Sequence, residues 1–397
     1  MKTVKQVCFK NANIVDVLEG RCFAGDALVE DGRIAAVGEV GPLPEGCRVV
    51  EMGGQYLAPG AFNCHTHITI SSDADMGLIG GSDARLTLLA IQSLQGFLKA
   101  GVTFIRDVGG YSGIDILLRD EIRAGRVQGP DMLACGRCIC ITGGHSWTLC
   151  GLQADGAEEM RKATRDQLRA GADWIKVIAT GGIMTKGVEP GAQQMDLEEM
   201  EAVVREAHKC GAKVCSHAQG ASGIRDSVRA GIDSIEHGCY LDGETISRMV
   251  EQGTWFCPTL AASHFILYGD SPVKQPDYVI RKTKAVIDSH IRSFKDAYAA
   301  GVKICMGTDA GTPSNPPENS CSEYVLMVEK GGLTPLEALR IGTIESAKLC
   351  GVEESLGSIT PGKRACFAVY RDDPLQTIAT VTDNRMTIKD GEIVYRA

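Results

Sequence analysis

The chain has 397 residues, of which 44% are hydrophobic and 23% are charged, and its net charge is -9. This length matches a barrel of about 250 residues with an accessory module, and the composition excludes a disordered chain. Basic residues are dispersed, which disfavours nucleic-acid binding, and no run resembles a signal peptide or approaches the ~18 apolar residues of a membrane span. We therefore expect a soluble cytoplasmic protein without nucleic-acid or membrane partners.

The two ends of the chain share short alternating runs separated by turns. The segment DGRIAAV near the start is echoed by DGEIVYR near the C-terminus, and such runs are typical of antiparallel β-structure. We predict a small β-sandwich module that both termini build jointly, from residues 1–57 and 355–397. A barrel of residues 58–354 would be inserted between them.

The first strand expected after this module is FNCHTHITI, residues 62–70. Residues two apart in a strand point to the same side, so His65 and His67 can face one point. Neutral imidazoles are good zinc ligands, but paired core histidines bonded to the backbone explain an isolated His-x-His motif about as well. The pair therefore predicts a metal site only together with further ligands.

Six later segments share one pattern, an amphipathic helical stretch, a glycine and then a short β-rich run. Glycine suits the left-handed end of a helix, and the run after it suits a buried parallel strand. FNCHTHITI and PDMLACGRC bring the strand count to eight, which predicts an α/β fold of the (β/α)8 TIM-like barrel type. The six glycines are Gly101, Gly171, Gly211, Gly231, Gly253 and Gly301.

Polar residues recur five to eight positions beyond five of these glycines, at the expected C-terminal ends of the strands. They are Asp107, Lys176, His217, His237 and Asp309. In a barrel these ends form one face, where the active sites of this architecture lie. We therefore expect these residues to converge with the two histidines of the first strand.

The sixteen cysteines are spread along the chain and often lie in apolar strands, which indicates reduced, buried thiols. One cluster, Cys135, Cys138 and Cys140, has a spacing that could chelate metal. The second cysteine pair of a zinc ribbon is missing, so we favour structural cysteines there.

Together these motifs resemble the amidohydrolase superfamily, in its imidazolonepropionase-like and prolidase-type branch, over nearly the whole chain. The matching segments are APGAFNCHTHI, DWIKVIATGG, VCSHAQG, SIEHGCYLD and MGTDAGT. The resemblance implies two divalent metal ions, zinc or manganese, held by six side chains. The implied ligands are His65, His67 and Asp309 for the first metal, His217 and His237 for the second, and Lys176 for both.

Lys176 matches the family position at which a lysine reacts with CO₂ and bridges the two metals. An ammonium group has no lone pair, whereas the carbamate is a carboxylate. Burial near positive charge should depress the pKa of Lys176 and supply the free amine that reacts. The alternative is a lysine whose charge is balanced by an acid such as Asp107.

Loop residues after the strands are candidates for substrate contact. The resemblance implies that His145 faces the substrate, that Tyr240 donates to the oxyanion, and that Asp309 serves as base and acid for a metal-bridging hydroxide. Ser263 and His264 could line the far wall of the pocket, although ordinary packing explains them as well.

A glycine-rich stretch after Lys176, GGIMTKGVEPGAQQ, could form a mobile cover over the site. Lys186 within it could meet a substrate carboxylate, although an exposed lysine is the default expectation.

The leading hypothesis is a binuclear amidohydrolase that cleaves the amide bond of a small carboxylate-bearing substrate, an Xaa-Pro or other dipeptide or an N-acyl amino acid. One alternative is a mononuclear cyclic amidine hydrolase or deaminase similar to imidazolonepropionase, which does not need the bridging lysine. Another alternative is a non-catalytic binding protein on the same scaffold. The presence of all six ligands argues against it. Since barrels of this family commonly assemble, we also expect a homo-oligomer.

Overall fold

The computed structural model describes residues 5–72, 81–271 and 274–397. The first four residues of the predicted terminal module therefore lie outside the described residues. Within the described ranges, we find no helix with the length and apolar character needed to cross a membrane.

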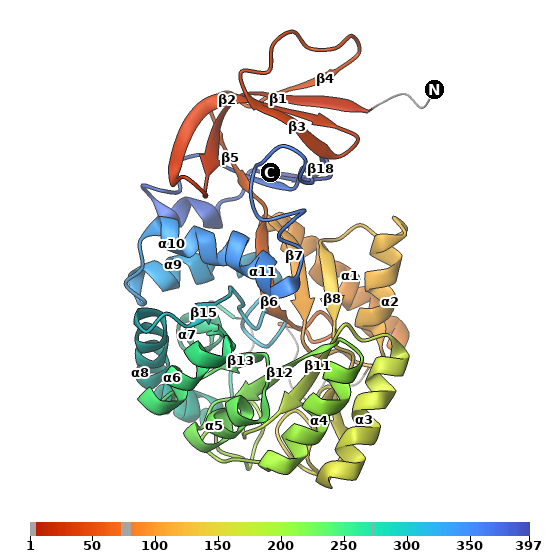
Figure 1. The fold of residues 1–397 in the computed structure, drawn as a ribbon, viewed down its shortest axis with the longest axis vertical. Helices are drawn as coiled ribbons and strands as arrows, with labels where there is room; N and C mark the ends of the chain where they lie inside the picture. Colours follow the sequence, from red (N-terminus) through yellow and green to blue (C-terminus); the bar gives the residue numbers. More distant parts are fainter. Residues whose placement is uncertain (1–4, 73–80, 272–273) are drawn as a thin grey trace.

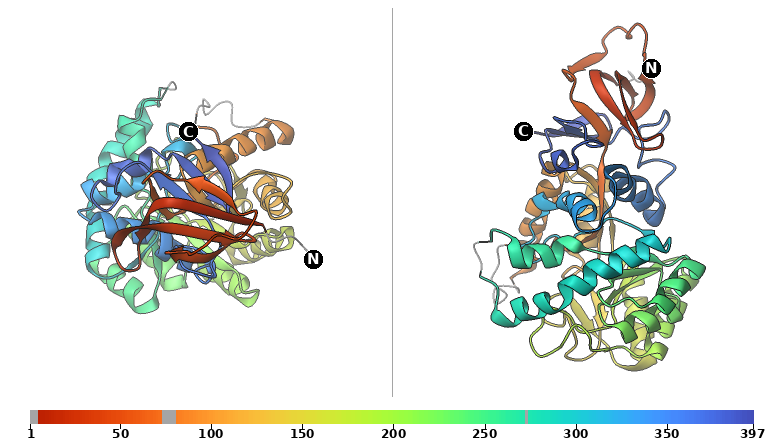
Figure 2. Two further views of the ribbon diagram at one scale, coloured as in Figure 1. Left: turned by 90° about the horizontal axis from the view of Figure 1, so that it is seen from above. Right: turned by 90° about the vertical axis from the view of Figure 1, so that its left-hand side faces the viewer.

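Both ends of the chain meet in one eight-stranded sheet at one end of the molecule (Figure 1). The two further views place this sheet, red and blue, at the same end of the α/β body (Figure 2). The order along the sheet is β18-β17-β16-β5-β1-β2-β3, and β4 pairs with β1. The arrangement as a sandwich stays a prediction. The strands are β1 Gln6–Asp16, β2 Arg21–Glu30, β3 Arg33–Gly38, β4 Arg48–Glu51, β5 Tyr56–Pro59, β16 Phe367–Tyr370, β17 Met386–Lys389 and β18 Glu392–Arg396.

Two hairpins of this sheet turn at Asp-Gly pairs. The φ angles are 47° at Asp31, 80° at Gly32, 51° at Asp390 and 76° at Gly391, and two successive positive values suit the tight turn that Asp-Gly favours. The antiparallel pairs β2–β3 and β17–β18 therefore agree with the repeated DG motif. β4 and β5, in contrast, run parallel to β1, because residues 39–47 cross over to the far side of β1 instead of forming a hairpin.

The rest of the chain is an α/β body with parallel strands. One sheet has the order β10-β9-β11-β12-β13-β14-β15 and another the order β6-β7-β8. Their strands are β6 Ala61–Thr66, β7 Val102–Asp107, β8 Asp131–Ala134, β9 Cys138–Cys140, β10 Gly151–Gln153, β11 Trp174–Ile178, β12 Lys213–Ala218, β13 Ser234–His237, β14 Trp255–Cys257 and β15 Lys303–Ile304.

Helices surround these strands on the outside (Figure 1). They are α1 Asp83–Lys99, α2 Ile114–Arg123, α3 Gly156–Ala170, α4 Leu197–Lys209, α5 Ala221–Ala230, α6 Gly243–Gln252, α7 Leu260–Tyr268, α8 Asp277–Ala299, α9 Ser322–Glu329, α10 Pro335–Arg340 and α11 Ser346–Cys350. Their apolar faces and the strands share one large hydrophobic core, as expected for amphipathic helices packed on a parallel sheet.

Each of the six predicted glycines lies between a helix and the strand that follows it. Their φ angles range from 72° to 97°, which is the left-handed conformation that glycine adopts without strain at a helix end. The prediction of six helix-to-strand passages is therefore confirmed. They join α1 to β7, α3 to β11, α4 to β12, α5 to β13, α6 to β14 and α8 to β15.

Backbone hydrogen bonds connect both edges of the three-stranded sheet to the seven-stranded sheet. The amide nitrogen of Asp173, before β11, donates to the carbonyl oxygen of Ala134, the last residue of β8, at 2.8 Å. At the other edge the amide nitrogen of Cys64 in β6 donates to the carbonyl oxygen of Met306, two residues beyond β15, at 2.7 Å. The strand ends are thereby fixed relative to one another.

Candidate metal centre

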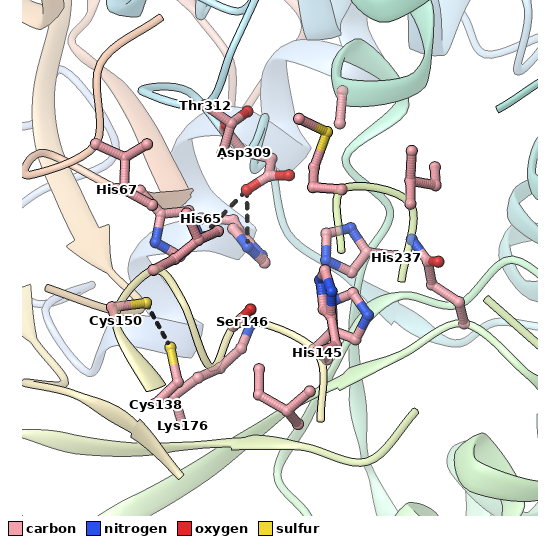
Figure 3. Close-up of a pocket in the computed structure, with 18 of the residues that line it drawn as sticks. His65, His67, Cys138, His145, Ser146, Cys150, Lys176, His237, Asp309 and Thr312 are labelled. Carbon is pink, nitrogen blue, oxygen red and sulfur yellow. Dashed lines mark hydrogen bonds and ion pairs between the residues drawn. The ribbon is translucent and has the colours of Figure 1, made fainter. Parts of the chain in front are cut away.

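A cavity at the C-terminal ends of the parallel strands brings together all six predicted ligands (Figure 3). β6 supplies the first histidine, and the second follows directly after its end. β11, β12 and β13 supply the lysine and the next two histidines, and the aspartate follows β15. The six predicted ligands, all of which line the cavity, are His65, His67, Lys176, His217, His237 and Asp309.

The candidate ligand atoms lie close enough to hold a metal ion. A ring nitrogen of His65, a ring nitrogen of His237 and a carboxylate oxygen of Asp309 all lie within 4.8 Å of one another. Asp309 Oδ1 is 3.4 Å from His65 Nε2 and 3.2 Å from His67 Nε2. The rings of His217 and His237 have centroids 4.6 Å apart, so the four histidines surround one space.

Hydrogen bonds outside the cavity set the tautomers of the first two histidines. His65 Nδ1 donates to Glu236 Oε2 at 2.7 Å, and His67 Nδ1 donates to the carbonyl oxygen of Gly109 at 2.9 Å. Since both acceptors can only accept, a proton lies on Nδ1, and Nε2 is the nitrogen that can bind a cation once it carries no proton.

The other two histidines are held by neutral groups. His237 Nδ1 is 2.7 Å from the hydroxyl oxygen of Thr259. His217 instead donates from Nε2 to the carbonyl oxygen of Gly181 at 3.3 Å, which leaves its Nδ1 lone pair available. Each histidine therefore has one nitrogen anchored in the protein and one available for a ligand.

Strained backbone at the strand ends turns two ligands toward the cavity. His237 has φ 69° and Asp309 has φ 64°, a conformation that costs of order 1–3 kcal/mol in residues other than glycine. The glycines around Asp309 allow close approach of its segment to β6, because a Cβ at Gly311 would lie 2.1 Å from the carbonyl oxygen of His67. The GTDAG sequence is thus explained by local geometry.

Lys176 is 2% exposed, and within residues 5–72, 81–271 and 274–397 its Nζ has no hydrogen-bond partner. Burial lowers the pKa of Lys176, but the thiol of Cys215 and the carboxylates of Glu236 and Asp309 outweigh burial and raise the pKa above its usual value. The expected depression of this pKa is therefore wrong for the protein groups alone, because the neighbours of the amine are acidic rather than positively charged.

Asp107 does not balance the charge of Lys176. Its Oδ2 accepts the backbone amide hydrogen of Ile68 at 2.7 Å instead. Lys176 is consequently a buried amine without an assigned partner among the described residues, an arrangement that is costly unless another group completes it.

The remaining ionisable ligands differ in charge. Burial lowers the pKa of His67, but its hydrogen bond to Asp309 and the charge of that carboxylate raise the pKa to about 9. Burial raises the pKa of Asp309, but hydrogen bonds from His65 and His67 hold this pKa well below its usual value. Burial holds the pKa of His217 and of His237 well below the usual value. At neutral pH His67 is therefore protonated and Asp309 is ionised, and the two form an ion pair. His217 and His237 are neutral.

Two of the predicted substrate residues line the same cavity. The ring of His145 lies 4.4 Å from that of His217, and its Nδ1 is 2.8 Å from the hydroxyl of Thr185. Burial lowers the pKa of His145 to about 3, so its ring is neutral. Ser263 also lines the cavity.

The structure does not bring the other two into this cavity. The hydroxyl of Tyr240 donates to the carbonyl oxygen of Ala285 in α8 at 3.3 Å. His264 lines a neighbouring cavity with Tyr268, because adjacent residues of α7 point in directions about 100° apart. The substrate roles of Tyr240 and His264 stay predictions.

Helix α8 holds the glycine-rich stretch that was expected to form a mobile cover. Lys282 Nζ donates to the carbonyl oxygen of Thr185 at 2.7 Å, and the Tyr278 hydroxyl donates to that of Met184 at 2.9 Å. Met184 reaches the cavity, whereas Lys186 is exposed and is not among the residues that line the cavity. The stretch is therefore a tethered part of the cavity wall.

All sixteen cysteines are free thiols in the structure, and their reduced state stays a prediction. The sequence cluster is divided in space. Cys138 Sγ lies 3.1 Å from that of Cys150 at the cavity wall (Figure 3), whereas Cys135 packs in another cluster with Cys215.

Sequence reasoning missed several groups around the centre. Glu236 and Arg106 lie in buried strands directly before His237 and Asp107, and a charged residue in an apolar strand was the available signal. Gln219 lines the cavity, and its buried Oε1 has no hydrogen-bond partner among the described residues.

Comparison with known proteins agrees with this architecture. The model of the amidohydrolase family matches residues 56–394. Ochratoxinase from Aspergillus niger is 32% identical over 358 residues, which span 81% of this chain and 71% of the relative. Imidazolonepropionase from Shewanella frigidimarina is 24% identical over 411 residues, or 92% of this chain and 91% of the relative. A crystal structure of a Xaa-Pro dipeptidase with methionine bound in its active site has a TM-score of 0.89 at 29% identity, with 99% of this chain and 100% of that chain covered.

Proposed function

The chain belongs to the amidohydrolase family of hydrolases acting on C–N bonds, and from this premise we propose that it is a binuclear metal-dependent amidohydrolase. Its substrate would be a small amide that carries a carboxylate, namely an Xaa-Pro or other dipeptide or an N-acyl amino acid. The observation that carries the proposal is the convergence of six potential ligands in one cavity. The similarity to a Xaa-Pro dipeptidase supports the substrate class.

The scaffold of the proposed enzyme is a (β/α)8 barrel over residues 58–354, with a terminal module from residues 1–57 and 355–397. The hydrogen bonds at both edges of the three-stranded sheet support closure through β6, β7, β8, β11, β12, β13, β14 and β15. Assembly into a homo-oligomer is part of the proposal.

The donor set fits two divalent cations. His65, His67 and Asp309 would hold the first, and His217 and His237 the second. The hydrogen bonds of the four histidines support these assignments, because each ring has one nitrogen anchored in the protein and a second that can bind a ligand once it carries no proton. When bound, two zinc or manganese ions would supply a water molecule of lowered pKa and a Lewis acid for the substrate carbonyl.

Lys176 would bridge the two cations as a carbamate. Its neutral amine would form a bond to the carbon of CO₂ and lose a proton, which converts an unpartnered buried nitrogen into a carboxylate with two ligand oxygens. This accounts for a lysine whose Nζ has no hydrogen-bond partner among the described residues.

Asp309 would move the protons of the reaction. Its low pKa keeps the carboxylate ionised, so it can accept a proton from the attacking water and pass it to the departing nitrogen. The neutral ring of His145 would bind the substrate by hydrogen bonding at the rim of the same cavity.

The main alternative is a mononuclear cyclic amidine hydrolase or deaminase, which the similarity to imidazolonepropionase keeps open. The position of Lys176 among the ligands favours the binuclear enzyme, because one metal ion needs no bridging lysine. A binding protein without catalysis is disfavoured by the full set of ligands.

The test is hydrolysis of a library of Xaa-Pro dipeptides, other dipeptides and N-acyl amino acids by the zinc- or manganese-loaded chain. We expect release of a free amino acid that disappears when a chelator removes the metal. A chain that carries two metal ions per molecule but hydrolyses none of these compounds would refute the substrate class. A chain that opens a cyclic amidine with one metal ion would establish the alternative.

A further inference from the structure

A buried chain of charged groups lies beneath the first half of the metal centre. Arg106 of β7 and Glu236 of β13 are both 0% exposed. Arg106 Nη2 donates to Glu236 Oε1 at 2.8 Å, and the second oxygen of this carboxylate, Oε2, accepts a hydrogen bond from His65 Nδ1 at 2.7 Å. Because β7 and β13 are not neighbours in either sheet, the ion pair spans the space that the strands enclose.

Several contacts fix the orientation of this pair. Arg106 Nε donates to the carbonyl oxygen of Cys64, the residue before His65, at 2.7 Å. The guanidinium carbon lies 4.5 Å from the centre of the Trp174 ring, where the positive charge faces the aromatic ring. The hydroxyl of Ser234 donates to the same carboxylate oxygen that accepts from Arg106. The carboxylate of Glu236 therefore has little freedom to rotate.

Stability alone does not account for the pair. Removing two charges from water costs several kcal/mol per ion, and apolar replacements of similar volume are often as stable. Arg106 also keeps one buried nitrogen, Nη1, without a hydrogen-bond partner among the described residues. A buried ion pair with an unsatisfied donor indicates a role other than stabilising the fold.

The contact with His65 distinguishes this histidine from the other ligands. His67 is anchored by a carbonyl oxygen and His237 by a hydroxyl, whereas His65 is anchored by an ionised carboxylate. A carboxylate on the outer nitrogen of a metal-binding histidine fixes the tautomer and ring orientation and raises the basicity of the ligand nitrogen.

We propose that Arg106 and Glu236 are positioning residues of the first metal site. Glu236 holds the Nδ1 proton of His65 and aims its Nε2 into the cavity, and Arg106 holds Glu236 in place. This inference rests on the proposed function, because it requires a cation at His65.

The test measures binding of cobalt(II) to the full-length chain after removal of its metal. The variant Arg106→Met/Glu236→Gln replaces both charges by neutral side chains of similar size, which avoids a lone buried charge. We expect one of the two cobalt ions to bind 10- to 100-fold more weakly, with a changed visible absorption spectrum, while the second binds as in the wild type. Circular dichroism would establish that the variant is folded.

The matched control is Arg119→Met/Asp173→Asn. It removes a partly buried ion pair, in which Arg119 Nη1 lies 2.6 Å from Asp173 Oδ2, and neither of these residues is among those that line the cavity. We expect this variant to lose stability but to bind cobalt with wild-type affinity and spectrum. A general effect of weakening the fold would reduce cobalt binding in both variants.

Wild-type cobalt binding by a folded Arg106→Met/Glu236→Gln chain would overturn the inference. If that variant does not fold, Glu236→Asp decides the question, since its charge remains but its carboxylate is withdrawn from His65 by one methylene group. Weaker binding of one cobalt ion by this variant supports the inference, and unchanged binding refutes it. A wild-type chain that binds no cobalt refutes the proposed function itself.

Discussion

The strand ends of the α/β body and the terminal sheet use charged residues in opposite ways. At the strand ends, charges are buried around a cavity, and Lys176 has no hydrogen-bond partner among the described residues. In the terminal sheet, Arg364 lies between two carboxylates and donates to both oxygens of Asp390 at 2.7 Å. A buried charged group with an unsatisfied hydrogen-bonding atom indicates a binding site, whereas a charged group whose hydrogen bonds are satisfied indicates structural support. Substitutions in the first region should therefore reduce activity, and those in the second should reduce stability alone.

The largest effect is expected for Asp309→Asn, at the strand ends. The amide keeps the shape of the side chain but cannot accept the proton of the attacking water, so kcat should fall by about 10²- to 10⁴-fold. Steady-state kinetics and a thermal melt on the same preparation check this prediction. Turnover within tenfold of the wild type would remove Asp309 from its proposed role.

The next largest effect is expected for Lys176→Met, which keeps the approximate length of the side chain but has no amine that could become a carbamate. We expect fewer metal ions per chain and a loss of kcat/KM of about 100-fold or more, because a metal ion contributes several kcal/mol of transition-state stabilisation. Elemental analysis and kinetics are the measurements. Wild-type metal content in this variant would show that the lysine is not a ligand.

In the terminal module we expect the opposite result, a loss of stability without a loss of activity, for Arg364→Met. This residue joins Asp390 of the sheet to Asp131 at the start of β8, and hydrogen bonds to charged groups contribute about 1.5–3 kcal/mol. We expect the free energy of unfolding to fall by about 2 kcal/mol with kcat unchanged. Denaturant unfolding and kinetics test this, and a parallel loss of kcat would break the separation between the two regions.

A further stability effect, which depends on pH, is expected within the α/β body. Burial raises the pKa of Glu323 from 4.5 to about 8, although the amides of Leu260 and Ala261 donate to its carboxylate. Between these two pH values the folded chain holds a proton that the unfolded chain releases. This contribution to stability is therefore present below about pH 4.5 and is lost as the pH rises through 8.

Glu323→Gln removes that titration. In the wild type, Glu323 should lower the free energy of unfolding by about 1.4 kcal/mol per pH unit between pH 5 and 8. This contribution to the slope should be absent in the variant. Denaturant unfolding at several pH values measures the slope for both chains. Identical slopes would show that Glu323 does not titrate in this way.

The sequence predicted the repeated helix, glycine and strand units because each depends on local chemistry. The left-handed conformation of Gly171, for example, follows from a helix that ends just before a buried strand. The metal ligands could be predicted from their sequence positions relative to these glycines. A similar distance, five to eight residues, from the glycine at a helix end to the C-terminal end of the next strand places them on one face.

Contacts between distant segments could not be predicted in this way. Glu236 reaches His65 across 171 positions of sequence, and no local pattern specifies that pairing. The parallel pairing of β4 and β5 with β1 depends on a crossover that the alternating runs do not encode. The raised pKa of Lys176 likewise depends on carboxylates that only the fold brings near it.

In the proposed metal centre, six side chains hold two metal ions that a modified lysine bridges. Anomalous diffraction at the zinc edge, from crystals of the zinc-loaded chain, tests it most directly. We predict two peaks, one beside His65, His67 and Asp309 and the other beside His217 and His237, with density for a carbamate on Lys176 between them. A single peak with an unmodified lysine would contradict the binuclear centre.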